Sequence, residues 1–127
     1  MKDSPARLLP ILRESWSLET SSQWSPENPT RGQCNVTSLV VNDLYGGEIA
    51  KTETPGGWHF YNRVDGERYD LTASQFAAPI NYADIPSTRS EALAGSTPQR
   101  YLALKVRVQA LVAAADPNLS QVLPAAP

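Results

Sequence analysis

Cys34 is the only cysteine of the chain, and its position would suit a nucleophile. The residues from Gln33 to Tyr45 predict a helix, so Cys34 would lie in its first turn, at the positive end of the helix dipole. That position favours the thiolate, which is the nucleophilic form of cysteine. The structural alternative is that Cys34 only packs in the core, as many single cysteines do.

His59 is the only histidine, and a turn signal brings it close to an acid. Asp65-Gly66 predicts a two-residue turn between two strands, so that Val64 faces Glu67 across the hairpin. In this register, His59 and Asp70 share one face of the hairpin and become diagonal neighbours, with Cβ atoms roughly 7 Å apart. A carboxylate could therefore reach the imidazole.

Together these three residues could form a catalytic triad for acyl transfer. Cys34 would attack a carbonyl carbon, His59 would hold the proton, and Asp70 would orient the imidazole and stabilise its charged form. The same three side chains could instead hold a zinc ion with an open fourth position. Ordinary structural roles also remain open, with His59 bonded to a strand neighbour and Asp70 serving as a turn residue.

An acyl-transfer site also needs hydrogen-bond donors for the oxyanion that forms during the reaction. The backbone amide of Cys34, at the start of the helix, is the first candidate donor. The loop before the helix offers side-chain amides for the second donor, with Asn28 as the first choice and Gln23 and Gln33 as the others. The alternative for Asn28, which precedes Pro29, is an ordinary turn.

Three aromatic residues, Trp24, Trp58 and Tyr61, could line an apolar substrate groove, and Trp24 and Tyr61 are the candidates that we retain. Trp24 lies in the polar loop before the helix, and Tyr61 shares a strand face with His59. The alternative is that both rings belong to the core, where large aromatic side chains are most often found.

The elements that must position these residues are short, because eleven prolines divide the chain. Helices are predicted over 5–16, 33–45 and 98–115, the last with Thr97 as N-cap and Pro98 in its first turn. Strands are predicted over 48–54, 57–64 and 67–72, and a wrapping loop over 73–96 holds helical turns at 74–76 and 89–94. The predicted fold class is α+β, with a central Cys-bearing helix packed on an antiparallel sheet.

Length and charge narrow the class of protein. The 127 residues predict one domain, with an ordered core over about 5–115 and a flexible tail over 116–127. The net charge of −2 goes against binding to nucleic acid. No apolar run reaches the roughly 20 residues of a membrane span, and charges interrupt the N-terminal segment, so we expect a cytoplasmic protein without a membrane anchor. One cysteine cannot form an intramolecular disulfide.

Three sequence runs resemble a known family: Trp24–Thr37, Gly56–Arg63 and Arg68–Thr72. They resemble the YunG-like family of bacterial proteins, over about residues 16–101. More distantly, a helix-borne cysteine followed by a histidine strand and an acidic strand is similar to the papain-like and transglutaminase-like superfamily. That similarity implies a papain-like half-domain with Cys34 as nucleophile, His59 as base and Asp70 as orienting group. The chain lacks the extended second lobe of papains and the tryptophan that follows their cysteine.

These features predict a small thiol hydrolase or acyltransferase. Its substrate would be an amide, isopeptide or ester in a small molecule or peptide, and the chemistry would need no cofactor and no metal. The alternative is a binding or scaffold module that keeps the fold and its pocket without turnover. The reactivity of the Cys34 thiol would separate the two readings.

Overall fold

The computed structural model describes residues 4–115, and within them the predicted α+β class is confirmed. Most predicted elements are present within one or two residues of their expected bounds. Residues 1–3 and 116–127, the latter including the predicted tail, lie outside the described residues. The elements in chain order are η1 (Pro5–Leu8), α1 (Leu9–Ser15), α2 (Cys34–Tyr45), β1 (Glu48–Thr54), β2 (Gly57–Val64), β3 (Glu67–Tyr69), η2 (Ala73–Gln75), β4 (Ile85–Ser87), α3 (Arg89–Ala94) and α4 (Pro98–Ala115).

The four strands form an antiparallel sheet in the order β3-β2-β1-β4. The predicted hairpin register is confirmed, because Val64 pairs with Glu67 across the Asp65-Gly66 turn. Both turn residues have positive φ, at 53° and 79°, as a tight hairpin turn of this type requires.

Two predictions about the sheet were wrong. The third strand ends at Tyr69 and does not reach Thr72, because the Asp70 side chain accepts hydrogen bonds from the Thr72 amide and hydroxyl and turns the backbone out of the ladder. The fourth strand, β4, lies inside the segment predicted as a wrapping loop. It contains Pro86, which a sheet tolerates because β4 is an edge strand.

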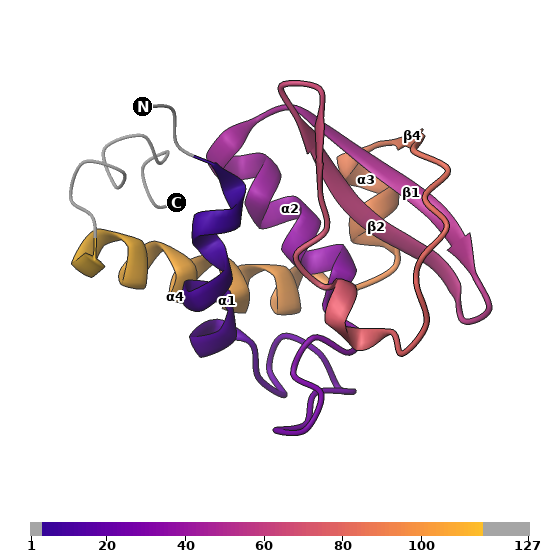
Figure 1. Cartoon of the computed structure of the whole chain (residues 1–127). Helices are drawn as coiled ribbons and strands as arrows, with labels where there is room; N and C mark the ends of the chain where they lie inside the picture. The colour runs from indigo at the N-terminus through magenta and orange to yellow at the C-terminus, as the bar shows by residue number, and fades with distance from the viewer. Residues whose placement is uncertain (1–3, 116–127) are drawn as a thin grey trace.

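Helix α2 lies at the centre of the molecule, with α1 and α4 on one side and the sheet and α3 on the other (Figure 1). Eight of its twelve residues are buried. Burial on both sides explains why α2 tolerates several β-branched valines, whose low helix propensity is outweighed by packing.

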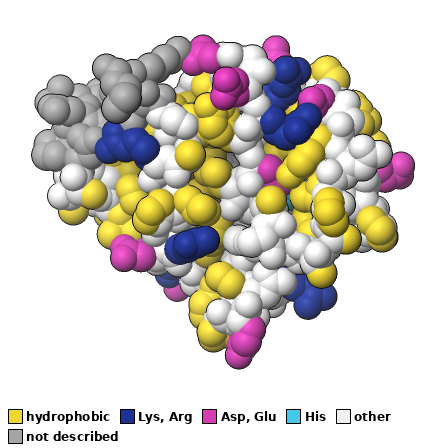
Figure 2. All heavy atoms as spheres, in the orientation of Figure 1, with side chains coloured by type: hydrophobic (Ala, Val, Ile, Leu, Met, Phe, Trp, Pro, Cys, Tyr) yellow, Lys and Arg dark blue, Asp and Glu magenta, His cyan; other side chains and the backbone are white. Residues whose placement is uncertain are grey.

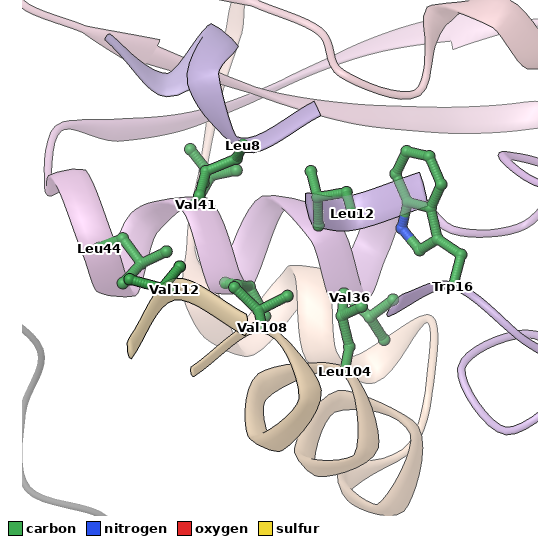
Figure 3. Close-up of a cluster of buried hydrophobic side chains, with 10 residues drawn as sticks. Leu8, Leu12, Trp16, Val36, Val41, Leu44, Leu104, Val108 and Val112 are labelled. Atoms are coloured by element: carbon green, nitrogen blue, oxygen red, sulfur yellow. The ribbon is translucent and has the colours of Figure 1, made fainter. Parts of the chain in front are cut away.

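Two apolar clusters fix α2 between these layers. Figure 3 shows the first cluster, in which side chains of α1 and α4 pack on the face of α2 that points away from the sheet. Its buried members are Leu8, Leu12, Trp16, Val36, Val40, Val41, Leu44, Leu104, Val108 and Val112. The second cluster joins α2 to the sheet and α3 through Cys34, Leu39, Ile49, Phe60 and Ala92. The start of α2 is therefore held firmly against the sheet.

The segment 76–84, which we call the crossing segment, runs over the face of the sheet opposite α2. Thr52 of β1 ties it down, since its hydroxyl donates to the carbonyl of Asn81 at 2.7 Å and accepts from the amide of Ala83 at 3.0 Å. The Tyr61 hydroxyl adds a bond to Asp84 at 2.9 Å. The crossing segment thereby covers β2 and buries the side chains of that face.

None of the helices within residues 4–115 is long and apolar enough to cross a membrane. On the face drawn in Figure 2, acidic and basic side chains are interspersed and form no extended basic area. This distribution fits the small net charge of the chain.

Candidate active site

Cys34 is the first residue of α2, and close packing and a hydrogen bond hold the loop before it against the segment that contains Thr20 and Ser21. Gly32 has φ of +74°, and a Cβ at this position would lie 2.4 Å from the Ser21 hydroxyl oxygen. Gln33 follows as the N-cap residue, and its side-chain oxygen accepts a hydrogen bond from Thr20 at 2.8 Å. These contacts hold the loop and thereby set where α2 begins and where the thiol lies.

His59 and Asp70 form a buried pair. The Nε2 atom of His59 lies 2.6 Å from Oδ2 of Asp70, and the two side chains are only 1% and 4% exposed. The other hydrogen bonds to the carboxylate come from the Tyr82 hydroxyl at 2.7 Å and from Thr72. Four donors thus fix the carboxylate, and the carboxylate in turn fixes the plane of the imidazole and favours a proton on Nε2.

Aromatic rings hold the imidazole from two further sides. The Phe76 ring meets it edge-on with centroids 4.8 Å apart, and the Tyr61 ring stacks on it at 5.9 Å. Phe76 belongs to the crossing segment and Tyr61 to β2, so the sheet and the segment that covers it position His59 together.

The imidazole is held in its charged form. Burial acts to lower the pKa of His59, but the hydrogen bond to Asp70 and the influence of Cys34 outweigh it and raise the pKa from 6.5 to about 9. His59 is therefore an imidazolium at neutral pH, next to the thiol. Its Nδ1 atom is buried and has no hydrogen-bond partner among the described residues, so this nitrogen is available to the sulfur.

Asn35, the residue after Cys34, fixes the resting thiol. The Cys34 thiol donates to Oδ1 of Asn35 at 3.4 Å, and Nδ2 of Asn35 donates to the carbonyl of Ala92 in α3 at 2.8 Å. Gly95 leaves room for this amide, because a Cβ there would lie 2.5 Å from Nδ2 of Asn35. Sequence reasoning did not single out Asn35, although its place beside the only cysteine was a signal for it.

Cys34 and His59 line one cavity of about 370 Å³, which we call the cleft. Three side-chain amides, of Gln23, Asn35 and Gln75, line it, and Arg31 is its only lining residue with a permanent charge, because no Lys, Asp or Glu lines it. The lining residues are Gln23, Arg31, Gly32, Cys34, Asn35, Thr54, Gly56, Trp58, His59, Gln75, Phe76 and Gly95. Gln75 and Phe76 reach the cleft from a segment more than forty residues after Cys34, and no local sequence pattern predicted their place there.

Of the three side-chain amides predicted as oxyanion donors, the structure brings one to the cleft. Gln23 lines the cleft, whereas Asn28 and Gln33 are not among its lining residues. Asn28 donates to the carbonyl of Gln75 at 3.5 Å and supports the loop, as a turn residue would. Gln33 is fully buried because its side chain turns away toward Thr20.

The two aromatic residues predicted to line a substrate groove do not line the cleft either. Trp24 packs against the first apolar cluster. Tyr61 is 2% exposed and bonds to the crossing segment through Asp84. Trp58, which is 47% exposed, lines the cleft in their place, because it lies at the open end of β2.

Within residues 4–115, no group of three or more His, Cys, Asp or Glu side chains is arranged to hold a metal ion. Asp70 bonds directly to the imidazole of His59 and does not converge with Cys34 on a common point. The zinc alternative therefore has no support in this arrangement.

Comparisons with known proteins cover nearly the whole described chain. The family model described as "YunG protein" matches residues 4–113, a range that includes Cys34, His59 and Asp70. A curated relative from Bacillus subtilis (strain 168), named "Uncharacterized protein YunG", is 48% identical over 95 residues, which are 75% of this chain and 83% of that protein. No solved structure matches the chain significantly.

Proposed function

Since the chain belongs to the YunG family, we propose for it a function drawn from the geometry of the cleft: a thiol hydrolase or acyltransferase with Cys34 as nucleophile. The observation that carries the proposal is the buried 2.6 Å bond between His59 and Asp70, on an imidazole that shares the cleft with the only cysteine. An imidazolium next to a thiol favours the thiolate, and a thiolate is the form that attacks carbonyl carbon.

The proposed reaction has two halves. In the first, the Cys34 sulfur forms a bond to the carbonyl carbon of an amide, isopeptide or ester, and the bond from that carbon to nitrogen or oxygen breaks. The leaving group takes the proton from His59, and an acyl thioester remains on Cys34. In the second, His59 accepts a proton from water or from another acceptor, whose oxygen or nitrogen attacks the thioester and releases Cys34. Asp70 stays ionised and stabilises each imidazolium.

The oxyanion of each step would lie at the start of α2. The first amides of a helix have no carbonyl partner inside it, so the backbone N–H of Cys34 is available as a donor. Gln23 is the side-chain amide that we propose as the second donor, because it lines the cleft.

We further propose that the fold is a papain-like or transglutaminase-like half-domain working in the cytoplasm on a small-molecule or peptide substrate. A central helix that begins with the cysteine and packs on an antiparallel sheet carrying the histidine supports the first part.

The test is the rate of Cys34 alkylation by iodoacetamide as a function of pH. Because the chain has one cysteine, every modification reports on this site. We expect an activated thiol in the wild type, and an ordinary one in His59→Ala and Asp70→Asn. Asp65→Asn is the matched control, since it removes the same charge in the hairpin turn outside the cleft. A thiol that is unreactive in the wild type and indifferent to these substitutions would favour the scaffold alternative.

A further inference from the structure

A second cavity of about 400 Å³ adjoins the cleft, and we call it the apolar groove. One wall is the turn from Glu53 to Gly56 between β1 and β2, and the other is the first part of the crossing segment, up to Asn81. Most of its lining is apolar, from Pro55, Phe76, Ala77, Ala78, Pro79 and Ile80. Its volume falls in the lower range of small-molecule sites.

The apolar groove and the cleft are adjacent. Thr54, Gly56 and Phe76 line both cavities and form their common border. Phe76 also touches the imidazole of His59, with ring centroids 4.8 Å apart. A group bound in the groove would therefore lie one side chain away from the catalytic base.

The apolar groove is formed before any ligand arrives. The two bonds of Thr52 to Asn81 and Ala83 hold the crossing segment on the sheet, and the prolines at 55 and 79 restrict the backbone of both walls. Ala77, Ala78 and Pro79 are nevertheless exposed to solvent. Apolar surface that is ordered and exposed at the edge of a catalytic cleft gains free energy when an apolar ligand covers it.

The two cavities differ in chemistry. Amides and Arg31 line the cleft together with Trp58 and Phe76, whereas the groove is mostly aliphatic apart from Phe76 and has Glu53, Thr54 and Asn81 as its polar lining. We propose that the apolar groove binds an aliphatic or small aromatic group of the substrate, carried next to the carbonyl that Cys34 attacks. This inference rests on the proposed function and adds the substrate class: amides or esters with an apolar substituent within a few bonds of the reacting carbon. The occupant is part of the substrate itself, because a ligand in the cleft already reaches the border of the groove.

The experiment measures the rate of Cys34 alkylation by N-alkylmaleimides, from methyl to hexyl. The sulfur adds to one alkene carbon and a proton to the other, and only the alkyl length changes along the series. We expect about a twofold rise in rate for each added methylene, because full burial would give about fourfold and the groove is open on one side. The rates are expressed relative to N-methylmaleimide, so changes in the intrinsic reactivity of the thiol cancel.

Two variants alter the groove in different ways. Ile80→Ser makes its wall polar, and Ala78→Trp fills it, and both should flatten the dependence on chain length. Leu102→Ser is the matched control, because Leu102 is 45% exposed on α4, outside both cavities. We expect that variant to keep the wild-type dependence.

The two proposals fail in different ways. A wild-type rate with N-methylmaleimide no faster than that of a free thiol overturns the proposed function, whatever the chain length does. A fast rate that does not depend on chain length overturns the apolar groove and leaves the activated thiol standing. A dependence that both groove variants retain also overturns it, because the preference would then come from another surface.

Discussion

Replacing Asp70 with Asn should remove the positive charge from His59 at neutral pH. The carboxylate bonds to Nε2 at 2.6 Å, and it is the main group that raises the pKa of the imidazole to about 9 against the opposing effect of burial. An asparagine keeps the shape and can still accept a hydrogen bond, but it offers no negative charge. Burial, which acts to lower the pKa, would then be opposed mainly by Cys34.

The size of the effect follows from the same numbers. If the imidazole returns to the ordinary value of 6.5 or below, its pKa falls by at least the difference between about 9 and 6.5. At about 1.4 kcal/mol for each unit, the net stabilisation of the imidazolium, to which Asp70 contributes most and Cys34 the remainder, is about 3 kcal/mol. Because the pair is almost fully buried, little of this energy is screened by solvent.

Nuclear magnetic resonance measures this directly, because the chain has one histidine and its imidazole signals need no assignment. Wild-type protein free of any affinity tag should titrate near pH 9, and Asp70→Asn at or below 6.5, while Asp65→Asn should titrate like the wild type. Far-ultraviolet circular dichroism confirms that each variant is folded. An Asp70→Asn imidazole that still titrates above pH 8 would contradict this role of Asp70, as would a wild-type imidazole that titrates at its ordinary value.

Three further predictions follow from the site. The folded-state pKa of His59 lies above its unfolded value, so its contribution to the free energy of unfolding is complete below pH 6.5 and is lost as the pH rises through about 9. Urea denaturation should therefore give a free energy of unfolding that is up to about 3 kcal/mol lower at high pH than below pH 6.5. Equal values at the two pH values would contradict the raised pKa. Because Arg31 is the permanent charge of the cleft, it should raise the rate of Cys34 alkylation by anionic iodoacetate relative to the rate with neutral iodoacetamide. Arg31→Gln should lower this ratio of rates severalfold, while Arg13→Gln, at an exposed position on α1, should leave it unchanged. An unchanged ratio in Arg31→Gln would show that the guanidinium does not act on the cleft. Gly95→Ala should displace the Asn35 side chain, lower the free energy of unfolding by about 1–3 kcal/mol and alter the reactivity of the Cys34 thiol. Thermal unfolding measures the effect on stability, and the alkylation rate measures the reactivity. A variant as stable as the wild type would mean that the Asn35 amide moves aside without cost.

Sequence patterns predicted the parts of the fold that depend on neighbours in the chain. The bounds of α2 follow from its apolar spacing and from Gly46, and the β2–β3 register follows from Asp65-Gly66. Both signals act over a few residues, where backbone sterics and periodicity decide the structure. Local patterns failed at β4, because its Pro86 is typical of a loop and only pairing with β1 makes it a strand.

The candidate site divides in the same way. The types of the candidate catalytic residues and their places on a helix start and a hairpin could be read from the chain, since only one cysteine and one histidine are present. The contact between His59 and Asp70 was predicted on the assumption that Asp70 lies in a strand paired with that of His59. In the structure the two side chains are bonded, but Asp70 follows the end of β3 and is not part of a paired strand.

What surrounds the candidate catalytic residues was decided by tertiary structure alone. Gln75 and Phe76 reach the cleft from more than forty residues after Cys34, Gly95 makes room for Asn35, and Tyr82 bonds to Asp70 from twelve residues away. Residue types and local backbone geometry were enough to predict which side chains are candidates for reaction and which helix and hairpin carry them, because both act over a few neighbouring residues. Tertiary packing decided the charge of the imidazole, the lining of the cleft and the presence of the apolar groove. Each of these depends on which segments, separated in sequence, pack against one another and keep water out of the space between them.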